Sequence, residues 1–112
     1  MIDQIPPAEL ADWFAREPGA APVLLDVREP WELQTASVTP QGFTLLAIPM
    51  NEVPARLGEL DPAQRIGCLC HHGARSQRVA AFLAQNGFGQ VANIAGGIDA
   101  WAARHDPSVA RY

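Results

Sequence analysis

Short apolar runs alternate along the chain with longer segments in which apolar residues recur every three or four positions. The runs PVLLDV (22–27), LLAIPM (45–50), RIGCLC (65–70) and QVANIAG (90–96) are predicted to be short strands, and the first is typical of a strand buried on both faces. Strands that alternate with helices at this pitch indicate an α/β fold with a mainly parallel sheet.

The segments between these runs carry helical spacing. PPAELADWFAREPG (6–19) is predicted to form a helix that stops at Pro18-Gly19, and ARSQRVAAFLAQNG (74–87) is the clearest helix, with Gly87 as its left-handed cap. One side of this second helix is predicted to carry Val79, Phe82, Leu83 and Asn86. The remaining segments are predicted as a short helix at 29–34 with Pro30 in its first turn, a loop at 35–44, a helix at 51–61 capped by Asn51, and a last helix at 97–105.

Bulk properties narrow the class of protein. The chain has 112 residues, so we expect one domain over 1–112, and its 48% apolar content is typical of a globular protein. No apolar run approaches the roughly 18 residues of a membrane helix, and the first residues do not resemble a signal peptide. A net charge of −4 argues against nucleic acid as a partner. We therefore expect a cytoplasmic protein that binds neither membranes nor nucleic acid.

The two cysteines, Cys68 and Cys70, are one residue apart. A disulfide between them would close a small strained ring and stabilise little, so we interpret both as reduced thiols. Cys68 lies inside a predicted strand and is expected to be a core residue. Cys70 lies where that strand ends.

In parallel α/β sheets, ligands bind beyond the carboxyl ends of the strands. Three predicted strand ends are candidates for such a site: Asp26-Val27-Arg28, Cys70 and the residues after it, and Ala95-Gly96-Gly97. Only the second offers a nucleophile.

The segment CHHGARS (70–76) joins this strand to the clearest helix. Gly73 permits a backbone conformation that other residues resist, and successive N–H groups in such a turn form an anion-binding nest at the helix N-terminus. Arg75 adds a positive charge and a planar fork of donors at the rim. The sequence thus predicts a Cys70 thiolate at the base of an anion cradle, suited to attack on an anionic electrophile.

Three other interpretations of this segment fit its residues less well. Cys70 could be a buried structural thiol, but the loop that follows it would then be unexplained. Four potential zinc ligands, Cys68, Cys70, His71 and His72, fall within five residues and cannot easily surround one tetrahedral ion. A redox disulfide between Cys68 and Cys70 would close the same small, strained ring. We therefore expect no metal and no cofactor.

Three segments in this order resemble the rhodanese family, the sulfurtransferases that form a persulfide on a cysteine. LLDVREPWEL (24–33) is similar to the first motif of that family, CHHGARS (70–76) to its active-site loop, and 93–112 to its closing segment. The resemblance covers nearly the whole chain and is closest to the compact single-domain members. It implies a three-layer α/β/α fold with a small sheet of four to five strands.

The resemblance assigns roles residue by residue. Cys70 matches the nucleophile, and Asp26 and Arg28 match first-motif positions whose role in the family is mainly structural. A Gly-His-Ile stretch of the family is replaced here by Ala36-Ser37-Val38. The remaining matches, which are active-site-loop and substrate-binding positions, are His71, His72, Gly73, Ala74, Arg75 and Ser76.

Side chains around the loop carry weaker predictions. The rings of His71 and His72 are expected at the rim, where the backbone N–H groups matter more than the imidazoles. Ser76 is expected either to cap the helix or to bond the sulfur. Trp31 and Trp101 are expected to serve packing.

The function implied is transfer of the sulfane sulfur of thiosulfate, or of another persulfide donor, through a Cys70 persulfide to a thiol, cyanide or a protein cysteine. Four residues separate Cys70 from Arg75, and the corresponding loop of Cys-dependent phosphatases is longer. A shorter loop favours sulfur over phosphate or arsenate chemistry. The alternative is a sulfur carrier or protein-binding module, and we expect a monomer or weak dimer.

Overall fold

The computed structural model describes residues 2–16 and 21–112 and contains a five-stranded sheet. The strands are β1 (Asp3–Ile5), β2 (Val23–Asp26), β3 (Thr44–Ala47), β4 (Ile66–Leu69) and β5 (Val91–Ile94), in the spatial order β1-β5-β4-β2-β3. Every strand pair within the described residues is parallel. The predicted α/β class with its small parallel sheet is confirmed.

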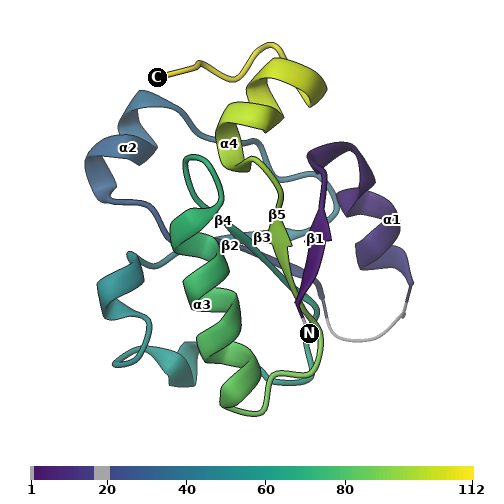
Figure 1. Ribbon diagram of the computed structural model, residues 1–112, viewed down its shortest axis with the longest axis vertical. Coiled ribbons are helices and arrows are strands. Elements are labelled where there is room, and N and C mark those ends of the chain that lie inside the picture. Colours follow the sequence, from purple (N-terminus) through teal and green to yellow (C-terminus); the bar gives the residue numbers. More distant parts are fainter. Residues whose placement is uncertain (1, 17–20) are drawn as a thin grey trace.

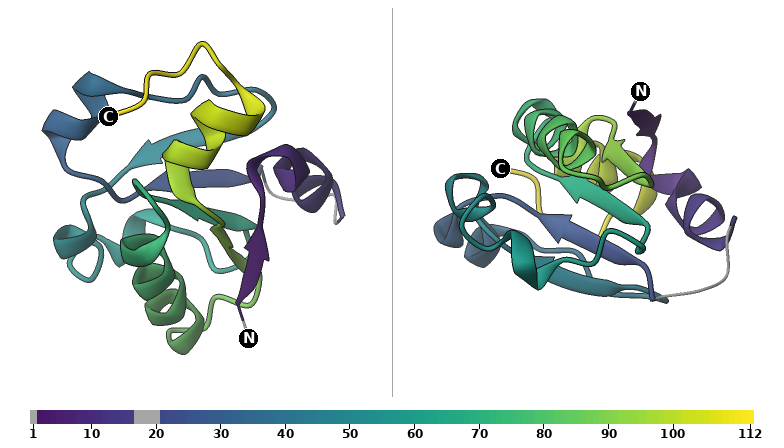
Figure 2. Two further views of the ribbon diagram at one scale, coloured as in Figure 1. Left: turned by 45° about the horizontal axis from the view of Figure 1, so that its top comes forward. Right: turned by 90° about the horizontal axis from the view of Figure 1, so that it is seen from below.

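Helices cover both faces of the sheet (Figures 1 and 2). The helix α1 (Leu10–Ala15) and the helix α4 (Gly97–Ala100), which continues as a π-helical turn over Trp101–His105, pack on one face. The long helix α3 (Ala74–Gln85) packs on the other, together with the 50–60 segment. The short helix α2 (Pro30–Thr35) follows β2 and lies beside the last residues of the chain (Figure 1).

Alternation along β4 shows how the strand serves both cores. Ile66, Cys68 and Cys70 contribute to the core under α3, whereas Leu69 contributes to the core under α1 and α4. This is the period-two pattern of a strand buried on both faces. Cys68 is fully buried, as its prediction as a core residue required, and burial raises the pKa of its thiol far above the usual value.

Several predicted elements differ from the structure. The segment 51–61 forms two short 3-10 turns, Met50–Glu52 and Leu57–Glu59, with no Asn51 cap, because Pro54 lacks an N–H group and restricts the residue before it. The strand β1 was not predicted, since three residues on the sheet edge carry no periodic signal. The Pro18-Gly19 stop lies outside the described residues.

The helix α3 matches its prediction more closely. Gly87 has a φ of 90°, as a left-handed cap requires, and Val79 and Leu83 are buried. Asn86, predicted on the same side, is exposed, because the helix has already ended at Gln85.

Within the described residues, no helix is long and apolar enough to cross a membrane.

Candidate functional site

The strand order brings the three candidate strand ends together. β4 lies between β5 and β2, and all three run in the same direction, so the segments that follow Asp26, Leu69 and Ile94 meet at one edge of the sheet. The loop that leads into α3 therefore faces α2, α4 and the last residues of the chain (Figure 1).

Cys70 is the first residue after β4 and is 1% exposed. Its Sγ accepts a hydrogen bond from the Gly73 N–H group at 3.1 Å and lies 3.2 Å from the Ser76 Oγ. Gly73 precedes α3 with a φ of 109°, a conformation that favours glycine strongly. The sulfur thus lies at the N-terminus of a twelve-residue helix, as the sequence predicted.

The turn after β5 holds this loop from the other side. The N–H groups of Ile98 and Asp99 donate to the carbonyl oxygens of Cys70 and His71 at 2.8 and 3.1 Å. Gly97 has a φ of 60°, and a Cβ there would overlap those same two carbonyl oxygens. The paired glycines after β5 therefore allow the close approach of two loops, a role that the sequence analysis did not assign.

Asn93 is a buried polar residue of β5 that sequence reasoning missed. Its amide nitrogen donates to the Gly73 carbonyl at 3.1 Å, which orients the amide oxygen toward the Ser76 hydroxyl at 2.5 Å. A hydroxyl has one proton, so Ser76 donates either to Asn93 or to the Cys70 sulfur. Ser76 is the third residue of α3 and makes no capping bond, so of its two predicted roles the structure supports contact with the sulfur.

Arg75 does not present a free fork of donors to the site. Its Nη1 and Nη2 donate to the two carboxylate oxygens of Glu32 at 2.7 and 2.8 Å. Glu32 is buried on α2, and the bonds from Arg75 hold the pKa of its carboxyl at about 2, against an ordinary value of 4.5. The same pairing raises the pKa of Arg75. The predicted positive rim is wrong in this respect, because a buried carboxylate from another element compensates the charge.

Asp26 and Arg28 form a second pair, which is fully buried. The Arg28 Nη2 lies 2.7 Å from the Asp26 Oδ2, and its other donors bind the carbonyl oxygens of Glu32 and Ala36 and the hydroxyl of Tyr112. Burial opposes the charge of Arg28, but the bonds to Asp26 and Tyr112 outweigh it and raise the pKa of the guanidinium. The pair fastens α2 and the segment after it to the end of β2.

Aromatic side chains form the outer part of the site. The ring of Tyr112 stacks on that of His71 with centroids 3.9 Å apart, and His71 stacks on His72 at the same distance. The Tyr112 hydroxyl donates to Glu32 at 2.9 Å. Trp31, predicted to serve packing, is 63% exposed on α2, because that helix turns Glu32 inward instead, and its ring meets Tyr112 edge-on.

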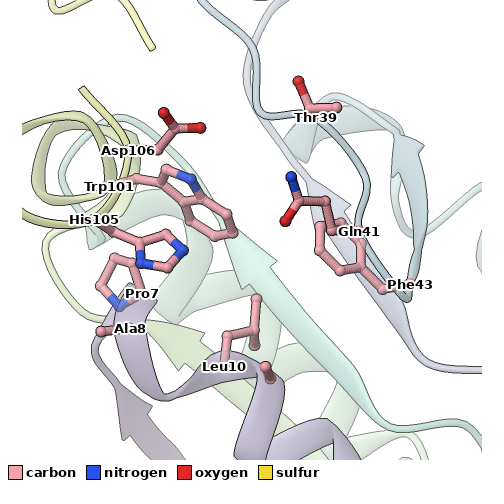
Figure 3. A pocket seen from close by; sticks show the side chains of 10 residues that line it. Pro7, Ala8, Leu10, Thr39, Gln41, Phe43, Trp101, His105 and Asp106 are labelled. Carbon is pink, nitrogen blue, oxygen red and sulfur yellow. The ribbon is translucent and has the colours of Figure 1, made fainter. Parts of the chain in front are cut away.

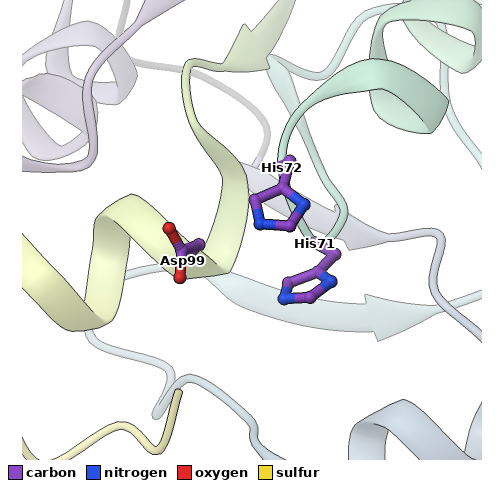
Figure 4. Close-up of side chains that lie close together, drawn as sticks. All are labelled: His71, His72 and Asp99. Atoms are coloured by element: carbon purple, nitrogen blue, oxygen red, sulfur yellow. The ribbon is translucent and has the colours of Figure 1, made fainter. Parts of the chain in front are cut away.

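The potential metal ligands are His71, His72 and Asp99, whose ligand atoms all lie within 4.8 Å of one another (Figure 4). His71 Nε2 is already bonded to the backbone oxygen of Tyr112, and the Asp99 carboxylate to Arg111. Among the described residues, the four-ligand set of Cys68, Cys70, His71 and His72 does not come together as a cluster.

A pocket of about 150 Å³ opens elsewhere, between α1, the 39–43 loop and the end of α4 (Figure 3). Trp101 forms one wall of it and is otherwise buried in the core, in line with its predicted packing role. Cys70 does not line this pocket.

The family model described as "Rhodanese-like domain" matches residues 7–104. The chain is 36% identical over 88 residues to a protein of Allochromatium vinosum named "Sulfurtransferase", covering 79% of this chain and 78% of that one. It is 33% identical over 81 residues to the "Putative sulfur carrier protein YrkF" of Bacillus subtilis, covering 72% of this chain and 42% of that one.

The fold has solved counterparts as well. The crystal structure of a rhodanese-related protein from Thermoplasma volcanium superposes with a TM-score of 0.77 at 29% identity, covering 98% of this chain and 99% of that one. Several other relatives are longer proteins, of which the chain covers 30% or less.

Proposed function

Because the chain belongs to the rhodanese-like domain family, we propose that it is a sulfurtransferase in which Cys70 carries the transferred sulfur as a persulfide. The observation that carries the proposal is the position of the Cys70 sulfur, buried at the N-terminus of α3 within hydrogen-bond distance of the Gly73 N–H group and the Ser76 hydroxyl. Donors in this position stabilise negative charge on the sulfur, both as thiolate and as persulfide.

The reaction would proceed by two displacements. The Cys70 thiolate attacks the outer sulfur of thiosulfate or of another persulfide donor, and the inner group leaves as an anion. A thiol, cyanide or a protein cysteine then removes the outer sulfur from Cys70 and restores the thiolate. Because both leaving groups depart as anions, neither step needs a proton from His71 or His72. Ping-pong kinetics are expected.

Each remaining residue of the loop has a place in this scheme. The backbone of the turn, which contains His71, His72 and Ala74, would surround the outer sulfur with N–H groups. Arg75 closes the rim, and Asp26 and Arg28 hold α2 against it. We further propose that 1–112 functions as one domain in the cytoplasm, as a monomer or weak dimer, without a cofactor.

A second candidate is a sulfur carrier whose donor and acceptor are both proteins. It is favoured by the similarity to a protein named as a putative sulfur carrier. Both candidates use the same Cys70 persulfide, and they differ in turnover. A carrier would gain sulfur from thiosulfate slowly and show little thiosulfate:cyanide activity, whereas a small-molecule sulfurtransferase would turn over with both.

The decisive experiment is mass spectrometry of the intact protein after incubation with thiosulfate and, separately, with an organic thiosulfonate. We expect a gain of one sulfur atom that cyanide removes, and no gain in Cys70→Ala. Cys68→Ala is the matched control, because it removes the other buried thiol and should keep the adduct. No adduct with either donor, or an adduct that survives in Cys70→Ala, would overturn the proposal, and hydrolysis of an aryl phosphate would point to a phosphatase instead.

A further inference from the structure

Three arginines around the Cys70 loop are paired with carboxylates. Arg75 is bound by both oxygens of Glu32, and the other two arginines in ion pairs at this edge of the sheet, Arg28 and Arg111, are bound by Asp26 and Asp99. The nearest exposed arginine in sequence is Arg78, one helical turn farther along α3. A dianion entering the site therefore meets no unpaired guanidinium on the loop itself.

The surroundings of the pair between Arg75 and Glu32 make it durable. Glu32 also accepts hydrogen bonds from the Tyr112 hydroxyl and the Glu29 N–H group at 2.9 and 2.8 Å, and its side chain is 3% exposed. A carboxylate held by four donors does not leave its arginine readily. A substrate anion is therefore not expected to displace Glu32 from Arg75.

Aromatic side chains lie at the rim of the Cys70 loop, where no unpaired guanidinium is present on the loop itself. Tyr112 lies flat on His71, and Trp31 projects beside it from α2, largely exposed. An exposed tryptophan and a half-buried tyrosine that stacks on a residue of the loop are well suited to contact an organic substituent.

We propose, on the basis of the function inferred above, that this site selects sulfane-sulfur donors with one negative charge and a carbon-bearing group, such as organic persulfides, over the thiosulfate dianion. Glu32 is the residue that determines this preference. It neutralises Arg75, so the second charge of thiosulfate and of the departing sulfite meets no free guanidinium on the loop, whereas an organic persulfide releases a thiolate with a single charge.

Each of the two donors can transfer its outer sulfur to Cys70 without a further reactant. With an organic persulfide anion R–S–S⁻, the Cys70 thiolate attacks the outer sulfur, the S–S bond breaks, and R–S⁻ leaves from a Cys70–S–S⁻ product. With thiosulfate the same attack leaves a Cys70 persulfide anion and a sulfite dianion. The two reactions differ in the charge and size of the leaving group.

Benzenethiosulfonate is the matched probe, because it replaces one charged oxygen of thiosulfate by a phenyl group and keeps the same outer sulfur. We would measure kcat/KM for each donor with saturating cyanide, for the wild type, Glu32→Gln and Glu59→Gln. Glu59 forms a comparable two-bond pair with Arg56 on the exposed 50–60 segment, so its variant makes the same change in net charge elsewhere.

We expect the wild type to prefer benzenethiosulfonate. Glu32→Gln should raise kcat/KM for thiosulfate roughly tenfold, as expected for one charge removed at short range in a partly screened site, and should change the other donor far less. Glu59→Gln should leave the ratio of the two donors unchanged. Added salt should reduce the gain seen in Glu32→Gln, because it screens the attraction of the freed Arg75 for the dianion.

A wild type that prefers thiosulfate, or a donor ratio that Glu32→Gln does not move, would overturn the inference. Trp31→Ala gives a second test that does not depend on how Glu32→Gln folds, because this side chain is exposed: it should lower kcat/KM for benzenethiosulfonate only, and an equal effect on both donors would count against the proposal. Failure of both donors to load sulfur on Cys70 in the mass measurement would instead remove the proposed function itself.

Discussion

Two arginine–carboxylate pairs lie close together in this fold and do different things. Asp26 and Arg28 are both inaccessible to solvent, with side chains 2% and 0% exposed, and Arg28 binds backbone carbonyls with its remaining donors. Glu32 is as deeply buried, but its partner Arg75 is 31% exposed at the rim of the Cys70 loop. The first pair holds α2 against the end of β2, and the second neutralises the arginine at the rim of the Cys70 loop. Both pairs have a buried carboxylate, so the feature that distinguishes them is the exposure of the arginine.

The largest effect is expected from the buried pair. Arg28→Ala would leave the Asp26 carboxylate buried without its cation and free the carbonyl oxygens of Glu32 and Ala36. Breaking a buried pair in this way costs about 3–5 kcal/mol. Urea unfolding should show this loss, and a loss below about 1 kcal/mol would contradict the structural role assigned to the pair.

Acid should weaken the pair between Glu32 and Arg75. The pKa of Glu32 is about 2 in the folded protein, below its ordinary value of 4.5, so its stabilising effect is complete above the unfolded pKa and is lost as the pH falls from about 4.5 toward 2. The effect is on the order of 3 kcal/mol. Urea unfolding of the wild type and Glu32→Gln at pH 6 and at pH 3 should show the difference between them shrinking in acid, and a constant difference would exclude this ionisation as its source.

Removal of the exposed partner should have a smaller effect on stability and a visible one on activity. Arg75→Ala leaves the Glu32 carboxylate with the Tyr112 hydroxyl and the Glu29 N–H group, at a cost of roughly 1–3 kcal/mol. It should also raise the KM for thiosulfate, since the uncompensated carboxylate now faces the donor.

The double variant Arg75→Ala, Glu32→Gln separates these effects. It should recover part of both losses, because it removes the unpaired charge, and strict additivity of the two single changes would show that the pair is not coupled.

The smallest effect is expected where neither partner is buried. Arg56 binds Glu52 and Glu59 on the surface of the 50–60 segment. Arg56→Ala should leave thermal stability and sulfur transfer unchanged within experimental error, because solvent already screens exposed pairs. A measurable loss of activity would show that this segment contributes to the site.

Much of the fold follows from local patterns. The apolar runs that became β2, β4 and β5 are long enough to be recognised, and α3 has a full amphipathic face with Gly87 after it. The missed or misassigned elements, β1 and the 50–60 turns, are three residues long each and depend on contacts made elsewhere in the chain. Short elements carry too few positions for a period to show.

Some residues of the candidate site could likewise not be predicted from local sequence patterns. Asn93 was not foreseen because one polar residue inside an apolar strand carries no sign of the helix that it will face. Glu32 and Tyr112 were missed for a related reason. A glutamate in a short helix normally faces solvent, and a tyrosine near the end of the chain shows no periodicity, so only their meeting with Arg28 and Arg75 reveals a function.

The sequence by itself determined the loop: a cysteine at a strand end, a glycine that permits the turn, and a helix whose N-terminus lies behind them. These are local properties, and each depends on residues within a few positions of Cys70. The tertiary structure decided the charge of the site. Because β2 and β4 are parallel neighbours, the helices that follow them begin side by side, and Glu32 meets Arg75 across 43 positions of the chain. Strand order, which no local pattern contains, thereby turned a positive rim into a neutral one.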